Sequence, residues 1–270
     1  LRGNSFVGSN PTLSAIYLIF YIFKKNVKIV FVIVLLSLCM KKVIFLFKNK
    51  SKFLVICHFL FSKFTSFFYK KQQISYKRAH QYLLKNKKIT NDYFSKHSFY
   101  FYYHLKKFDK NFNYLEIGSY EGNSSIFVAK NFKDAHICCV DNWVGTEEYN
   151  DNLSFSKIEK NFDFNVLRFK KIKKIKSSSD LFFKKNKAFF DVIYIDGYHF
   201  GPQVYKDCVN SWKILKKNGI MICDDYILDC YKDITKNPCY SINKFLKEIL
   251  NSFKILKVSN SQIFIKKQYT

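Results

Sequence analysis

The chain has 270 residues, of which 48% are hydrophobic, so it can fold around a full core and is not a disordered protein. Its 46 basic residues against 20 acidic ones give a formal charge of +26, a balance typical of proteins that bind nucleic acids or anionic membranes. Only three of the basic residues are arginine, however. Lys, Phe, Tyr, Ile and Asn are all abundant and share A/T-rich codons, so an A/T-rich coding sequence is the favoured explanation of the high charge. Phosphate and base recognition usually recruits arginine, so the charge alone does not establish a nucleic-acid partner.

The first 39 residues are expected to be a non-native upstream translation. Residues 7–15 back-translate to a plausible 3′ end of a serine transfer-RNA gene, which makes Met40 the natural start. Residues 40–99 are predicted to form a basic, apolar helical extension. The apolar run over residues 29–40 is short of the ~20 residues that span a bilayer. A helical extension of this composition is also compatible with peripheral contact with a membrane.

From about residue 74, short apolar runs alternate with longer amphipathic ones, which predicts a parallel sheet covered by helices, with the main domain over residues 100–270. The expected strands are 114–118, 136–141, 166–171, 191–197 and 220–225, and the expected helices are 124–131, 178–185, 203–217 and 241–251. The runs at 253–258 and 262–267 are joined by a short turn and indicate an antiparallel hairpin. The predicted fold class is therefore α/β, a mostly parallel seven-stranded sheet with helices on both faces.

The eight cysteines form no Cys-x-x-Cys pair and have no spacing suited to zinc. Several lie inside apolar, strand-like runs. We therefore expect reduced core cysteines in a cytoplasmic protein.

The stretch Tyr114–Ser125 has the pattern of a buried strand, a glycine turn and the start of a helix. Gly118 and Gly122 allow a ligand to approach the backbone closely, and Ser124 or Ser125 is expected to cap the helix. A strand-turn-helix junction of this kind is typical of sites for nucleotide-like ligands. Since the chain has Tyr and Glu where a dinucleotide-binding turn cradles its pyrophosphate, the ligand is expected to lack one.

Glu116-x-Gly118-x-x-x-Gly122, an acidic Asp141 after the second strand, Asp196 at the end of the fourth strand and the terminal hairpin together resemble the class I S-adenosylmethionine-dependent methyltransferases. The resemblance covers about residues 100–267 and implies a Rossmann-like fold.

Two further segments sharpen this resemblance. Ile195–His199 and Gly219–Tyr226 look like the branch that carries Asp-Gly-x-His followed by Asp-Asp-Tyr, which resembles methyltransferase family 24 and includes sugar and small-molecule O-methyltransferases.

The resemblance implies a site for S-adenosylmethionine. Its residues are Glu116, Gly118, Ser119, Tyr120, Gly122, Ser124, Asp141, Asn142, Trp143 and Asp196. Glu116 suits the amino-acid end of this ligand, directly or through water, and Asp141 suits the ribose hydroxyls. Asn142 and Trp143 are expected to flank the adenine, Trp143 by stacking. Residues 177–180 lie where the family commonly contacts the adenine, but no firm assignment follows from their sequence.

Asp196, Asp224 and Asp225 are expected to converge at the carboxyl ends of strands four and five, where three carboxylates would select Mg²⁺ or a similar hard ion. The alternative is that Asp224 and Asp225 cap a loop while Asp196 acts alone. His199 follows Asp196 by three residues and is either the base that deprotonates a substrate hydroxyl or a histidine that orders the turn.

These features predict O-methylation of a small hydroxylated acceptor, such as a sugar or glycan precursor, with Asp196 and His199 as catalytic residues. The aromatic segment Tyr93–Tyr103 is expected to cover the acceptor. An RNA-directed methyltransferase is one alternative, although Asp-Gly-Tyr-His replaces the Asn/Asp-Pro-Pro-Tyr/Phe motif of base N-methyltransferases. A non-catalytic, membrane-associated protein on the same scaffold is another.

Overall fold

The computed structural model describes residues 39–108, 111–145, 155–259 and 261–268. The chain divides into two compact units, residues 1–43 and 44–270, and every element described below belongs to the second. The predicted upstream translation therefore lies almost wholly outside the described residues. Within the described part of the chain, no helix is long and apolar enough to cross a membrane.

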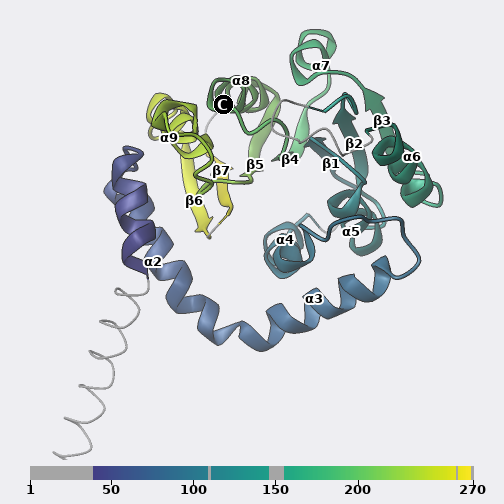
Figure 1. Ribbon diagram of the computed structural model, residues 1–270, viewed down its shortest axis with the longest axis horizontal. Coiled ribbons are helices and arrows are strands. Elements are labelled where there is room, and N and C mark those ends of the chain that lie inside the picture. Colours follow the sequence, from purple (N-terminus) through teal and green to yellow (C-terminus); the bar gives the residue numbers. More distant parts are fainter. Residues whose placement is uncertain (1–38, 109–110, 146–154, 260, 269–270) are drawn as a thin grey trace, which may run out of the picture. The chain divides into compact units, whose positions relative to one another are not determined.

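A seven-stranded sheet with the strand order β3-β2-β1-β4-β5-β7-β6 forms the centre of the second unit (Figure 1). The first five strands in this order are parallel, whereas β7 pairs antiparallel with both β5 and β6. The strands are β1 (Asn113–Ile117), β2 (His136–Asp141), β3 (Ile172–Lys176), β4 (Phe190–Ile195), β5 (Leu215–Cys223), β6 (Phe253–Val258) and β7 (Ile263–Lys267). The predicted mostly parallel sheet with a C-terminal antiparallel hairpin is confirmed.

Helices cover both faces of this sheet. Figure 1 shows α4 and α5 on one face and α7 and α8 on the other. The helices are α2 (Phe53–Phe68), α3 (Lys70–Leu84), α4 (Ser98–Leu105), α5 (Asn123–Asn131), α6 (Phe155–Val166), α7 (Ser179–Lys185), α8 (Gly201–Ile214) and α9 (Pro238–Glu248), with 3-10 turns η1 (Ser95–His97) and η2 (Ile234–Lys236). Because helices cover both faces, consecutive residues of a central strand such as Val192 and Ile193 are both fully buried.

Helices α2 and α3, which precede the sheet in the chain, pack against different parts of the domain. The hydroxyl of Ser62 in α2 accepts a hydrogen bond from the backbone N–H of Val258 in β6 (3.4 Å). The ring of His80 in α3 packs edge-on against Phe94 and Phe127 and shares a 2.6 Å hydrogen bond with Asn123. These contacts place α2 beside the hairpin edge and α3 beside the helices of the opposite half.

The third strand was predicted at residues 166–171, and this prediction is wrong. The segment before it, Phe155–Val166, is α6, and β3 follows at Ile172–Lys176. Apolar residues at 155, 158, 162 and 166 recur at helical spacing. Strand β3 is an edge strand, and its three lysines among five residues give it the composition of a solvated tract. The helix expected to end at residue 217 also ends earlier, at Ile214, and β5 begins at Leu215.

Candidate active site

The strand order reverses between β1 and β4, and in open α/β sheets ligands bind beyond the carboxyl ends of the strands at such a point. Gly118 follows β1 with φ +86°, and a Cβ built on it would lie 2.0 Å from the carbonyl oxygen of Asp196, which follows β4. Only glycine therefore allows the loops after β1 and β4 to approach this closely. The approach brings the turn of β1 and the carboxylate of Asp196 to the same site.

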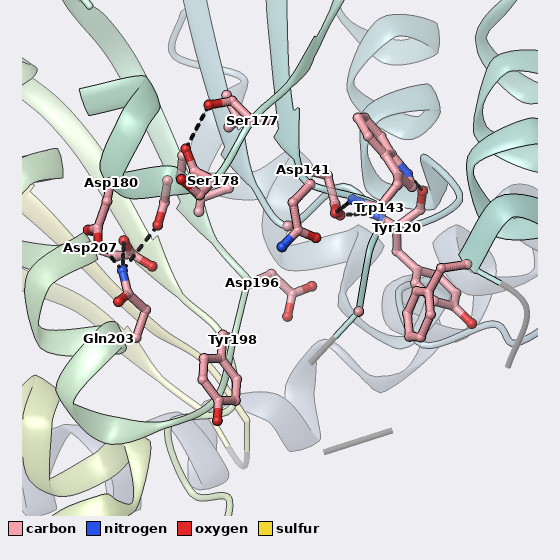
Figure 2. A pocket seen from close by; sticks show the side chains of 18 of the residues that line it. Tyr120, Asp141, Trp143, Ser177, Ser178, Asp180, Asp196, Tyr198, Gln203 and Asp207 are labelled. Carbon is pink, nitrogen blue, oxygen red and sulfur yellow. Dashed lines mark hydrogen bonds between the residues drawn. The ribbon is translucent and has the colours of Figure 1, made fainter. Parts of the chain in front are cut away.

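A cavity of about 260 Å³ opens beside this point, and we name it the Asp141 cavity. In Figure 2, Asp141, Trp143 and Tyr120 line one side, a second group of polar residues lines the other, and Asp196 lies between them. The second group consists of Ser177, Ser178, Ser179, Asp180, Gln203 and Asp207. The cavity thus contains the predicted Asp141, Asn142 and Trp143, together with the segment 177–180 to which the sequence assigned no firm role.

Asp141 is held in place by the backbone around it. Its carboxylate accepts hydrogen bonds from the N–H of Tyr120 (2.9 Å) and of Trp143 (2.8 Å). Burial raises the pKa of the Asp141 carboxyl, and these backbone donors oppose that rise. Since each carboxylate oxygen has two acceptor positions, the fixed side chain also has acceptor positions for the hydroxyls of a ligand.

Trp143 lines the same cavity but has little free ring surface. Its indole N–H donates to the carbonyl of Tyr120 (2.8 Å), its ring lies 4.9 Å from that of Phe162, and the ammonium of Lys174 lies 4.7 Å from the ring centroid. The residue is 4% exposed. These contacts leave only a small part of the ring for the predicted stacking on an adenine.

Glu116 lines neither this cavity nor the one described next, in contrast to the direct ligand contact that the sequence allowed. Its carboxylate is fully buried and accepts hydrogen bonds from the hydroxyls of Tyr114, Ser124 and Ser125 (2.8, 2.8 and 2.9 Å). Burial raises its pKa to about 7, against the effect of these hydrogen bonds. The predicted serine cap is wrong, because α5 begins after Gly122 (φ +80°) without a side-chain cap. Glu116 therefore holds the turn after β1 through these buried hydrogen bonds.

A second cavity, of about 310 Å³, adjoins the first and shares Gly118, Tyr120 and Asp196 with it. We name it the His97 cavity. Its other polar and aromatic lining residues are Asn91, Tyr93, Phe94, Lys96, His97, Ser119, Glu121, Asn123, Ser124, Tyr194, His199, Asp224 and Asp225. Part of the segment 93–103, which was expected from the sequence to cover an acceptor, lines this cavity.

Glu121, in the turn after β1, forms hydrogen bonds with Thr90, which precedes the segment that lines the His97 cavity. Its carboxylate accepts hydrogen bonds from the N–H and the hydroxyl of Thr90 (2.6 Å each) and from the amide of Asn161 (2.7 Å). The sequence analysis used Glu121 only as an argument against a pyrophosphate. Its contact with Thr90 joins residues far apart in the sequence, so no local pattern predicts it.

Three side chains of the His97 cavity form a compact group of potential metal ligands. One donor atom each from Asp196, His199 and Asp225 lies within 4.8 Å of the others. His199 Nε2 is 2.8 Å from Asp225 Oδ2 and 4.0 Å from Asp196 Oδ1. The predicted set of three carboxylates differs from this group in one member, since His199 takes the place of Asp224.

Asp224 is not a member of this group, and its carboxylate makes other hydrogen bonds. Its Oδ2 accepts hydrogen bonds from the hydroxyl of Tyr194 and from the side-chain amide of Gln262 (2.8 Å), and its Oδ1 accepts the N–H of Asp225 (2.8 Å). Asp225 has the left-handed φ of +51°. Burial and then the charge of Asp224 raise the pKa of the Asp196 carboxyl, so a cation near Asp196 would relieve an unfavourable charge.

The fold and these two adjoining cavities define a class I methyltransferase-like domain, and comparisons with known proteins agree. The structure is similar to a Staphylococcus aureus protein assigned as a caffeoyl-CoA O-methyltransferase (16% identity, TM-score 0.51, 77% of this chain and 99% of that chain). It is also similar to TomG of Streptomyces achromogenes, an O-methyltransferase of tomaymycin synthesis solved with S-adenosylmethionine (11% identity, TM-score 0.50, 73% and 89%). At these identities the likeness shows the fold.

A sequence comparison points to the same class. Residues 115–226 match a family model described as a methyltransferase domain. No curated protein sequence matches the chain. The chain therefore carries an S-adenosylmethionine-dependent methyltransferase domain, as its sequence predicted.

Proposed function

We propose that this protein transfers a methyl group from S-adenosylmethionine to a hydroxyl group of a small acceptor, such as a sugar or glycan precursor. The observation that carries the proposal is the group Asp196, His199 and Asp225, which lies in the His97 cavity where it adjoins the Asp141 cavity. The donor would bind in the Asp141 cavity and the acceptor in the His97 cavity. Asp141 and the turn at Gly118 would hold the adenosyl part, and Glu116 would position that turn.

A hydroxyl is a weak nucleophile until its proton is removed, and the group at the junction offers bases for this step. The imidazole of His199 is oriented by its 2.8 Å contact with Asp225. Proton transfer from the acceptor oxygen to this pair would raise the electron density of that oxygen as it attacks the methyl carbon. The proton then stays on the pair until the product leaves.

As an alternative to this role as a base, the same group is suited to hold a divalent metal ion. Two carboxylates and one imidazole are ligands of Mg²⁺, Mn²⁺ and related ions, with the nitrogen favouring transition metals over Mg²⁺ alone. MycE of the mycinamycin pathway, a fold relative (14% identity, TM-score 0.50, 71% of this chain and 54% of that chain), was solved with Mg, S-adenosylhomocysteine and mycinamycin VI. A bound ion would lower the pKa of an acceptor hydroxyl.

The walls of the His97 cavity favour a polar acceptor with apolar faces. Aromatic rings from Tyr93, Phe94 and Tyr120 are combined with the polar side chains of Asn91 and Asn123. Rings that cover the apolar faces of a sugar and polar groups that bind its hydroxyls are the pattern such a ligand requires. This combination supports the sugar or glycan class over an apolar acceptor.

Methyl transfer from labelled S-adenosylmethionine to a panel of hydroxylated compounds, with and without a metal chelator, tests the proposal. We expect label in an alkali-stable ether, and we expect Asp225→Asn to lower the rate by about 10²-fold or more while S-adenosylmethionine still binds. A matched control is Asp229→Asn, an exposed carboxylate of the same loop that lines neither cavity. Label that is found only on RNA bases or on nitrogen would refute O-methylation of a small acceptor.

We also propose peripheral membrane contact through α2, the localisation that the basic extension suggested. Four phenylalanines of this helix, Phe53, Phe61, Phe67 and Phe68, are 62–76% exposed, and lysines flank them. Exposed aromatic side chains beside lysines suit the interface of an anionic bilayer. Cosedimentation with vesicles containing phosphatidylserine should fall for Phe61→Ser/Phe67→Ser, and equal binding by this variant and the wild type would contradict the contact.

A further inference from the structure

A third cavity, of about 490 Å³, lies beside the His97 cavity and shares Lys96 and His97 with it. We name it the Lys257 cavity. The extension, η1, α4 and the end of β6 build its walls, and its polar lining residues are Ser62, Lys63, Ser66, Gln73, Lys96, His97, Tyr100, Lys257, Ser259 and Ser261. No carboxylate is among these lining residues. Three lysines and four serines give the lining positive charge and hydroxyl groups.

Lys257 is the central observation because it is buried without a counter-charge. The residue is 5% exposed, and its ammonium lies 3.4 Å from the centroid of the Tyr100 ring. Among the described residues no carboxylate pairs with it and no oxygen accepts a hydrogen bond from it. A buried ammonium is costly unless it is paired and hydrogen-bonded. In the free protein the Tyr100 ring is the only partner of its charged form among the described residues, and an anion that enters the cavity would stabilise that form.

A second buried lysine of the same hairpin has hydrogen-bond acceptors for its ammonium within the chain. Lys267 is 8% exposed, and its ammonium donates to the carbonyls of Trp212 (2.8 Å) and Leu215 (2.9 Å). Lys257 instead lines a cavity. A β-bulge between Ile255 and Lys257 interrupts the alternation of β6, so that Lys257 and Val258 are both buried.

We propose that the acceptor carries a phosphate-type anion and that Lys257, with Lys63, Lys96 and the nearby serines, binds this anion while the acceptor hydroxyl lies in the His97 cavity. The inference rests on the proposed function, since it names the class of acceptor. Lysine binds phosphate as a point charge, and the lysines and serines of the lining supply positive charge and hydroxyl donors for such an anion. Phosphorylated or nucleotide-linked sugars combine such an anion with methylatable hydroxyls.

Thermal unfolding of the full chain with sodium sulfate, at ionic strength held constant with sodium chloride, tests this proposal with a phosphate-shaped probe. Sulfate should raise the melting temperature of the wild type with a saturable dependence. Lys257→Met should weaken this response about tenfold or more, because a charge-assisted hydrogen bond is lost. The variant itself should be no less stable than the wild type, since the substitution removes a buried charge.

Lys254→Met is the matched control, because Lys254 is an exposed lysine of the same strand outside the cavity. It removes the same charge and should leave the sulfate response unchanged. Equal responses in the wild type and Lys257→Met, equal losses in both variants, or acetate acting as well as sulfate would each overturn the proposal. Binding of S-adenosylmethionine by calorimetry separates the two claims: if it binds while sulfate does not, only the anion site fails.

Proton uptake provides a second readout that a merely structural lysine would not give. Burial, and then the charge of Lys63, lower the pKa of Lys257 to about 7, so at pH 8 it is mostly neutral in the free protein. The other titratable groups facing it are Lys96 and His97 of η1 and Tyr100 of α4. Calorimetric titrations with sulfate in buffers of different ionisation enthalpy measure the protons taken up on binding. Because sulfate itself does not titrate near pH 8, the uptake of a fraction of a proton is expected to come from Lys257. No uptake by the wild type would contradict the assignment.

Discussion

Replacement of Gly118 by alanine should disrupt the junction on which both cavities depend. The added Cβ would lie 2.0 Å from the carbonyl oxygen of Asp196 and 2.5 Å from Cα of Gly197, and both of these are backbone atoms that no rotamer change can move. Relief of the contact requires the loops after β1 and β4 to separate by about 1 Å, since close-packed interiors do not tolerate such overlap. The φ of +86° adds about 1–3 kcal/mol for a residue with a side chain.

The expected result is a loss of both stability and ligand binding. A strain of about 2–3 kcal/mol should lower the melting temperature by roughly 5–10 °C. A displacement of about 1 Å at Asp196 should lower the methyl-transfer rate by about 10²-fold. Differential scanning calorimetry and titration with S-adenosylmethionine measure the two effects on the same preparation.

Gly197→Ala is the matched control, because a Cβ on Gly197 would meet its nearest atom, Cγ2 of Ile117, at an ordinary 3.4 Å. Gly197 lies in the same site but has no positive φ, so this variant should stay within about 1 kcal/mol of the wild type. If Gly118→Ala were as stable as Gly197→Ala and bound S-adenosylmethionine equally well, the reasoning from the close approach of β1 and β4 would be refuted.

Two further substitutions test the buried hydrogen bonds around the site. Burial raises the pKa of Glu116 from 4.5 to about 7, so its contribution to stability is largest below pH 4.5 and declines by roughly 3 kcal/mol as the pH rises through 7. Glu116→Gln should remove this decline, and urea unfolding of both proteins between pH 4.5 and 7.5 would give parallel curves if the reasoning were wrong. Asn165 is fully buried, and its amide donates to the carbonyls of Lys88 (3.0 Å) and Glu121 (2.9 Å). Its Oδ1 accepts the backbone N–H of Lys88 (2.7 Å). Asn165→Ala should therefore lower the free energy of unfolding by about 2–3 kcal/mol and speed hydrogen exchange at the Lys88 N–H, whereas unchanged exchange would contradict its role in holding residues 88–90.

The sequence predicted the central strands well because their apolar runs are buried on both faces. The run before Asp196, for example, could only be a short buried strand, and β4 occupies it. The edge strand β3 was missed because it pairs on one side only, and three of its five residues are lysines, which interrupt the apolar pattern that burial imposes. Helix α6 was not among the helices predicted with bounds, although its apolar residues recur at helical spacing.

The sequence predicted the positions of Asp141 and Asp196 at strand ends, where they line the same cavity, because residue type and strand end together determine those positions. The sequence did not predict which of two adjacent residues joins the group, because tertiary contacts decide this. Asp224 and Asp225 are adjacent in sequence, but the hydroxyl of Tyr194 and the amide of Gln262 hold Asp224, so that Asp225 pairs with His199 instead. Lys257 shows no motif at all, because its burial depends on α2 and on a β-bulge.

The central claim is that the methyl donor binds in the Asp141 cavity. Isothermal titration of the full chain with S-adenosylhomocysteine tests it most directly, with Asp141→Ala as the variant that removes the fixed acceptor and Asp134→Ala as an exposed control. We expect one site per chain in the wild type and the control, and an affinity at least about tenfold weaker in Asp141→Ala. Absence of binding by the wild type, or equal affinity in Asp141→Ala, would contradict the account.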